Sequence, residues 1–252
     1  MHAGAVARLT VDGHVTSHPV DPESRPSVIT AGPDGALWCT LNGADRIARI
    51  TVTGAVTTFP APGGPYGITV GPDDALWYTA MTTDRIGRVT TEGHVTEFPL
   101  PTNGGMAAMI TSGADDALWF ALNQANAIGR MTVDGDVTLY ELPTPGAAPV
   151  GIAVDQDGVW FVEIGAGQLG RVDGGRIVEY PLPDRAARPH AITAEGWFTE
   201  WGASRIGRVH ADGAIDEYDL PTPASEPHGI TVGPDGLVYV ALETGAVARL
   251  QP

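Results

Sequence analysis

The sequence predicts an all-β protein, a β-propeller of four-stranded antiparallel blades. An arginine recurs seven times at steps of 37 to 42 residues, each time after a pair such as Ile-Gly or Val-Ala. Between these arginines lie short apolar and β-branched runs bounded by Gly, Asp and Pro, and no stretch keeps a helical period. A period of about 40 residues filled with strands is typical of propellers, with one blade for each repeat. The arginines are Arg8, Arg49, Arg88, Arg130, Arg171, Arg208 and Arg249.

Each repeat contains four segments, which predict the four strands of one blade. In the second repeat the first segment is Pro-Tyr66-Gly-Ile-Thr, and the next carries Trp77 after a Gly-Pro-Asp turn. The third segment holds Ile-Gly-Arg88, and residues 95–99 form the fourth, Val-Thr-Glu-Phe-Pro. The second segments carry the aromatic residues Trp38, Trp77, Trp119, Trp160, Trp197 and Tyr239. We expect the tryptophans of this series to be buried between sheets.

The two ends of the chain interrupt the repeat. Residues 1–20 carry an Arg-type segment and a fourth-type segment with no first or second segment before them, so we expect six repeats plus a partial N-terminal blade. Residues 14–20 could complete the last blade and close a six-bladed ring, which would remove a free sheet edge. Alternatively, residues 1–20 are the second half of a first blade. In that case roughly 20–35 further residues are expected upstream, a length set by the blade period.

Composition favours a single soluble domain over residues 1–252. The sequence has no apolar run long enough for a transmembrane helix and no signal-peptide pattern at its start. Its one cysteine, Cys39, follows Trp38 in a strand and is expected to be a packed core thiol. A cytoplasmic location and a monomeric state are the corresponding expectations.

The charge balance excludes some partners. The formal net charge is −16, and the basic residues are 14 arginines without a lysine. Such an acidic chain repels nucleic acid and anionic membranes, so neither is an expected partner. The repeated arginines are predicted to be structural, pairing with carboxylates or turn carbonyls between blades.

One position varies inside the otherwise constant first segment, just after its first residue. A residue that varies while its neighbours stay constant is not required by the repeat structure. The innermost strand of a blade lines the central channel of a propeller, so this position is a candidate for ligand binding. We predict that the two histidines found there come from adjacent blades and face the axis. In chain order the residues are Ser27, Tyr66, Ala108, Val150, His190 and His228.

Carboxylates lie near the second histidine. Glu226 is two residues before His228, so in an extended strand both side chains would point the same way. Glu243 follows Tyr239 by four residues, whereas Glu163 and Glu200 follow their tryptophans by three. Glu243 is therefore expected to project differently from those two.

Three interpretations of this His-Glu group are open. The side chains could be solvated or turn-bonding groups without a function. They could form a zinc site, which needs three or four ligands in a tetrahedral array. They could also bind magnesium through carboxylates and leave a histidine free as a base for proton abstraction. The spacing of these residues does not distinguish the zinc site from the magnesium site.

Several segments resemble the virginiamycin B lyase (streptogramin B lyase) family over essentially the whole chain. They are Arg-Pro-His190-Ala-Ile-Thr-Ala, Trp197-Phe-Thr-Glu200-Trp201-Gly-Ala and Ser225-Glu226-Pro-His228-Gly-Ile-Thr, together with the repeated Ile-Gly-Arg and Pro-Leu-Pro runs. The repeat frame is shared with many propellers, and the Glu-Pro-His-Gly-Ile segment is the more specific part.

The resemblance implies a seven-bladed propeller that linearises the cyclic depsipeptide of B-type streptogramins. The family opens the threonine ester by elimination with a divalent metal, usually Mg2+. Matched by motif, His228 is the general base, His190 contacts substrate, and Glu226 and Glu243 are the metal-associated carboxylates. The sequence departs from the family in lacking a complete first blade.

The implied chemistry is consistent with these residue types. A histidine titrates near neutral pH, at about 6.5, and can take the threonine α-proton. A metal polarises the carbonyl and stabilises the departing carboxylate, and two carboxylates with waters suit magnesium better than zinc. The alternatives are a non-catalytic propeller of the NHL type that binds a ligand or protein, and a lactonase-like hydrolase. The His-His-Glu group favours the enzyme, since a scaffold does not need it.

Overall fold

The computed structural model describes residues 4–156 and 158–251 of the chain. These residues form 25 β-strands and one short 3-10 helix, Asn42–Ala44, in agreement with the expectation of almost no helix. No helix among them has the length and apolar character required to cross a membrane.

The strands are short, and most have five or six residues. In chain order they are β1 (Ala5–Leu9), β2 (Val15–Pro19), β3 (Pro26–Ala31), β4 (Leu37–Leu41), β5 (Arg46–Ile50), β6 (Val56–Pro60), β7 (Pro65–Val70), β8 (Leu76–Ala80), β9 (Arg85–Val89), β10 (Val95–Pro99), β11 (Ala107–Ser112), β12 (Ala117–Leu122), β13 (Ala127–Thr132), β14 (Val137–Glu141), β15 (Pro149–Val154), β16 (Val159–Glu163), β17 (Gln168–Asp173), β18 (Arg176–Pro181), β19 (Pro189–Ile192), β20 (Trp197–Glu200), β21 (Arg205–Val209), β22 (Ile215–Asp219), β23 (Pro227–Val232), β24 (Val238–Leu242) and β25 (Val247–Leu250).

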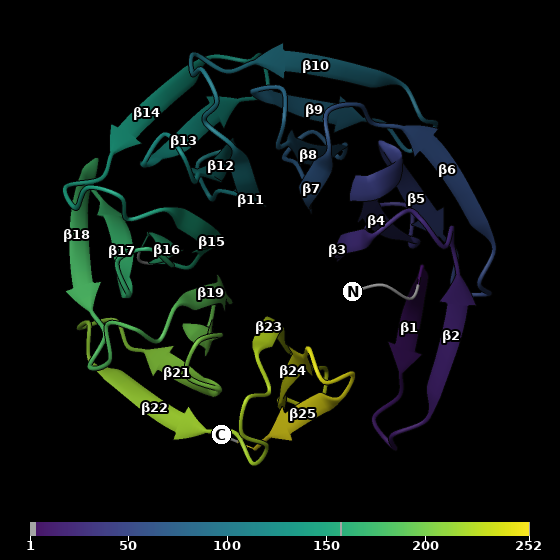
Figure 1. The fold of residues 1–252 in the computed structure, drawn as a ribbon. Coiled ribbons are helices and arrows are strands. Elements are labelled where there is room, and N and C mark those ends of the chain that lie inside the picture. Colours follow the sequence, from purple (N-terminus) through teal and green to yellow (C-terminus); the bar gives the residue numbers. More distant parts are fainter. Residues whose placement is uncertain (1–3, 157, 252) are drawn as a thin grey trace. The chain divides into compact units, whose positions relative to one another are not determined.

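Strands that follow one another in the chain pair with one another, as in the blades of a propeller (Figure 1). Five sheets have four strands and begin at β3, β7, β11, β15 and β19, which confirms the predicted all-β class and its four-stranded blades. The sixth repeat, β23–β25, has three strands. β2 pairs with β1 in a two-stranded sheet. In the described part of the chain, residues 14–20 therefore do not complete the last blade. That this pair is half of a first blade stays a prediction.

Contacts divide the chain into two compact units. The first runs to Phe120 and includes Arg130–Val137, and the second comprises Ala121–Gly129 and the chain from Thr138 onward. In the first unit a core forms between sheets β3–β6 and β7–β10 around Trp38. In the second unit, equivalent cores join β15–β18 to β19–β22 and β19–β22 to β23–β25. The five repeat tryptophans are at most 7% exposed, as predicted.

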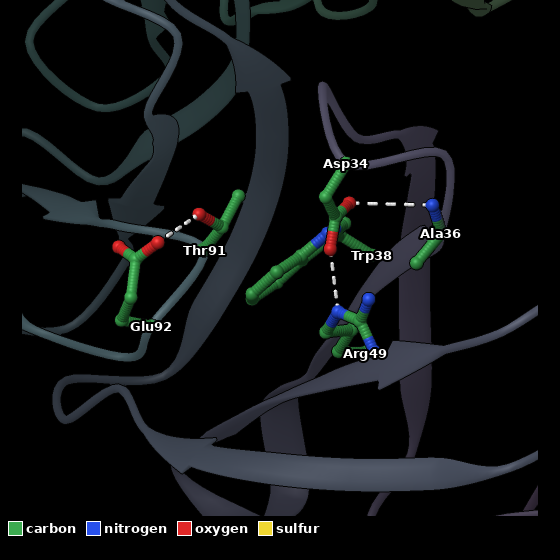
Figure 2. A network of polar contacts seen from close by, with 6 residues as sticks. All are labelled: Asp34, Ala36, Trp38, Arg49, Thr91 and Glu92. Carbon is green, nitrogen blue, oxygen red and sulfur yellow. Dashed lines mark hydrogen bonds and ion pairs between the residues drawn. The ribbon is translucent and has the colours of Figure 1, made fainter.

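In the first three repeats, an aspartate in the turn before the tryptophan strand binds both the tryptophan and the repeat arginine. Figure 2 shows the first case, in which Asp34 accepts hydrogen bonds from Trp38 Nε1 at 3.0 Å and from Arg49 Nε at 2.5 Å. The second and third repeats have the same arrangement at Asp73 and Asp115.

The expectation that the repeat arginines pair between blades is therefore wrong for Arg49, Arg88 and Arg130. Each of them binds the aspartate 15 positions earlier, within its own sheet, because the strands that carry the tryptophan and the arginine are neighbours. Arg171 differs, since its Nη1 donates to the carbonyl of Ala211, which lies in the next sheet, in the turn between β21 and β22.

Candidate functional site

The structure brings His190 and His228 together in the second unit. Each histidine is the second residue of the first strand of its sheet, β19 or β23, directly after a proline. The two ring centroids are 4.6 Å apart, and the rings meet edge to face at 74°. The position that varies within the repeat therefore places two imidazoles side by side from neighbouring sheets.

The imidazole of His228 contacts the carboxylate of Glu243. The His228 Nε2 atom lies 2.8 Å from Glu243 Oε1, and the side chains are 22% and 40% exposed, respectively. The other ring nitrogen of His228, Nδ1, is buried and has no hydrogen-bond partner among residues 4–156 and 158–251. Nε2 is therefore the ring nitrogen whose surroundings Glu243 sets.

Glu243 lies in the turn after β24, and backbone hydrogen bonds tie that turn to the residues before β23. The Glu243 amide donates to the carbonyls of Ser225 at 3.1 Å and Glu226 at 3.3 Å. Ser204 accepts a hydrogen bond from the Ser225 amide at 3.0 Å. The backbone of Glu226 and that of Glu243 are therefore adjacent, although 17 positions separate them in the sequence.

The expectation that Glu226 and His228 project alike from one extended strand is wrong. Glu226 precedes β23 and has a φ of 45°, in the left-handed region, so the alternation of a strand does not apply to it. The residue before the first strand has a positive φ in the other five repeats as well, at Arg25, Gly64, Met106, Ala148 and Arg188. This conformation belongs to the repeat rather than to the site.

Trp201 contacts the site and was not among the site residues predicted from the sequence. Its ring centroid is 6.2 Å from that of His228, and within the described part of the chain its buried Nε1 has no hydrogen-bond partner. The guanidinium of Arg188 lies 5.5 Å from the centre of the Trp201 ring. One signal was available, since Trp201 is the one tryptophan of six that is not at the repeat position.

Burial sets the charge of His190. Desolvation lowers the pKa of His190 to about 4, and the nearby imidazole of His228 acts in the same direction. His190 is consequently neutral at pH 7. A neutral imidazole beside His228 can donate or accept one hydrogen bond but does not supply a positive charge.

Two buried glutamates lie at the ends of β16 and β20. Glu163 and Glu200 are both 0% exposed, whereas Leu242 occupies the same strand position in the sixth repeat. Gln168 donates to Glu163 Oε2 at 2.6 Å, and Arg205 Nη2 lies 2.8 Å from Glu200 Oε2. The exposed Glu243 is therefore in a different environment from these two, as its offset predicts.

Stability should depend on pH through Glu163. Burial raises the pKa of Glu163 from the usual 4.5 to about 8, with the hydrogen bond from Gln168 opposing the shift. Between these values the folded protein binds more protons at this site than the unfolded chain, so the free energy of unfolding should fall as pH rises from about 5 to 8. Glu163→Gln, which is neutral throughout, should flatten this dependence.

Urea unfolding at several pH values measures this effect. The exposed Glu195 provides the matched substitution, Glu195→Gln, which should leave the pH dependence as in the wild type. An unchanged slope in Glu163→Gln would show that Glu163 is already ionised in the folded protein.

The donor set of the site suits a hard cation better than zinc. Among residues 4–156 and 158–251, no group of three or more His, Cys, Asp or Glu side chains is arranged to hold a metal ion. Zinc sites in proteins use at least three such ligands. Magnesium is often bound by one or two carboxylates, with water and substrate oxygens completing its shell. Glu226 and the exposed Glu243 could serve in this way.

Comparisons with known proteins agree on one family. A family model described as "Virginiamycin B lyase family" matches residues 1–250. A virginiamycin B lyase of Nocardia farcinica is 46% identical over 191 residues, which are 75% of this chain and 66% of the relative. The match thus spans just under two thirds of that curated relative.

Solved structures give the same result. The crystal structure of selenomethionine-substituted virginiamycin B lyase from Staphylococcus aureus is 40% identical, with a TM-score of 0.93 over 98% of this chain and 87% of the other. Another crystal structure, with the same identity, coverage and TM-score, is of a catalytically inactive histidine-to-alanine variant of that enzyme with quinupristin.

Proposed function

Because the chain belongs to the virginiamycin B lyase family, we propose that it linearises cyclic depsipeptides of the streptogramin B type by elimination at the threonine ester. The observation that carries the proposal is the pair of His228 and Glu243, with their atoms 2.8 Å apart and the neutral His190 beside them. The related enzyme loses activity when one histidine becomes alanine, which supports a histidine-dependent reaction.

In the proposed reaction His228 is the general base. His228 Nε2 lies against Glu243 in the free protein. To act as the base, the imidazole must be neutral with its single proton on Nδ1 and turned away from Glu243, so that the lone pair of Nε2 can take the threonine α-proton. As that C–H bond breaks, a double bond forms between the threonine α and β carbons. The bond from the β carbon to the ester oxygen breaks, and the carboxylate leaves. A positioned base contributes about 10²- to 10⁴-fold to such a step.

His190 is proposed to contact the substrate. It is neutral at pH 7 and half-buried, so it can form a hydrogen bond to a peptide group of the depsipeptide at a small desolvation cost. Its ring also packs against that of His228 and limits the orientations of the base.

Glu226 and Glu243 are proposed to hold Mg2+. When bound, the ion would supply Lewis-acid stabilisation for the negative charge that develops on the ester oxygens. The negative charge of the whole chain, −16, favours retention of a divalent cation and disfavours anionic competitors.

Mass spectrometry of quinupristin after incubation with the protein and magnesium tests the proposal. Elimination should give a linear product with the mass of the starting ring and a new retention time. A product heavier by one water would identify a hydrolase instead. Recovery of the unaltered ring would favour a binding protein without this activity.

A further inference from the structure

One hydroxyl group connects the backbones next to the two histidines. Thr199 lies in β20 and is fully buried. Its Oγ1 accepts a hydrogen bond from the amide of Ala191 and donates one to the carbonyl of His228, both at 3.0 Å. A hydroxyl has a single proton to donate, so the bond to His228 uses it.

These two backbone groups lie where the strand pairing is interrupted. The register shifts between Pro189 and Ile192, and again between Pro227 and Ile230, so each histidine is inside an irregular stretch. A bulge leaves residues unpaired and re-aims their side chains. At this place Thr199 provides the hydrogen bonds that the β-ladder does not.

Two other repeats contain a threonine with the same hydrogen bonds, and three repeats form their sheets without it. Thr40 and Thr79 stand at the equivalent position and likewise bond to the carbonyls of Tyr66 and Ala108 in the next sheet, both at 2.6 Å. In the other three repeats the position is filled by residues without a hydroxyl, which are Ala121, Val162 and Ala241. A threonine here is therefore not a requirement of the fold.

We propose that Thr199 is a positioning residue for the reaction described above, setting the distance between His190 and His228. The amide of Ala191 belongs to the peptide that follows His190, and the carbonyl of His228 belongs to the peptide that follows His228. Each peptide is attached to a histidine Cα, so fixing both planes fixes the directions in which the imidazoles leave the backbone. The inference rests on the proposed function for its kinetic consequence only.

Thr199→Val removes the hydroxyl with little change in shape. Since a misplacement of about 1 Å can cost about 100-fold in rate, kcat for ring opening should fall by about 10-fold or more, while KM changes little. Thr199→Ser should restore most of the rate. Thr79→Val is the matched control, because it removes the same two types of hydrogen bond at a place without histidines, and its kcat should equal that of the wild type.

The nuclear Overhauser effect between the two imidazole rings gives a readout that does not need activity. It should be strong in the wild type, Thr199→Ser and Thr79→Val, and weaker in Thr199→Val. Thr199→Ala is made in parallel in case the valine variant does not fold, since alanine fills this position in β12 and β24.

An unchanged ring-to-ring effect in both hydroxyl-free variants would overturn the proposal, as would an equal loss of kcat in Thr79→Val. If the wild type opens no depsipeptide, the proposed function fails, and the ring-to-ring effect still decides the role of Thr199.

Discussion

His228→Ala should abolish ring opening and leave the fold intact. The substitution removes the proposed base, so the rate should fall by about 10²- to 10⁴-fold, the range found for a positioned general base. His228 is 22% exposed on its side chain and lies at a position where the other repeats carry Ser, Tyr, Ala, Val and His. The scaffold therefore tolerates a small residue there, and circular dichroism should be unchanged.

Turnover of quinupristin under saturating magnesium measures this effect. His210→Ala is the matched control, since His210 is also paired with a carboxylate, Asp216, but on the exposed side of another strand pair. His190→Ala should reduce activity less than His228→Ala, because it removes a substrate contact and not the base. Wild-type activity in His228→Ala would remove this residue from the mechanism.

The repeat made most of the fold predictable. Tryptophan, aspartate and arginine recur at fixed spacings in the first three four-stranded sheets because these sheets use the same hydrogen bonds, such as those that join Asp34, Trp38 and Arg49. A periodic sequence reports such local contacts directly. The pairing at the two ends was less predictable, since the sequence left open whether residues 14–20 pair with the last repeat or with the segment before them, as they do in the structure.

The histidines could be found from the sequence because they replace other residues within a constant frame. That logic fails where the backbone leaves the strand. Glu226 has the left-handed conformation of its repeat position, so the alternation of a strand does not predict the direction of its side chain. It also fails for Thr199, because a threonine at this position occurs in three repeats and its link to His228 joins residues 29 positions apart.

The buried glutamates show a third limit. A carboxylate at the end of a strand is normally solvated, and the sequence does not reveal that Glu163 and Glu200 are fully buried. Their raised pKa values result from this burial, so they depend on the packing of the folded chain rather than on local sequence.

Removal of divalent metal should stop turnover, and Glu226→Gln should raise the magnesium concentration required for half-maximal activity. A neutral amide is a poorer ligand than a carboxylate for a hard cation. Changing a residue that only hydrogen-bonds a metal ligand already costs about 10- to 100-fold in metal affinity. The increase in the magnesium requirement should therefore be at least about 10-fold. Glu243→Gln should raise the requirement as well and in addition lower kcat, since Glu243 also contacts Nε2 of His228.

Activity against magnesium concentration, after treatment with EDTA, separates these effects. The wild type should lose activity in chelator and regain it with added magnesium, and the exposed Glu195→Gln should follow the wild-type curve. Because Glu226 makes no ion pair with His228 in the structure, its variant isolates the cation requirement from the orientation of the base. Full activity of the wild type in excess chelator would refute the assignment of a metal to these carboxylates. A Glu226→Gln curve that coincides with the wild type would remove Glu226 from the metal site and leave Glu243 as its one carboxylate.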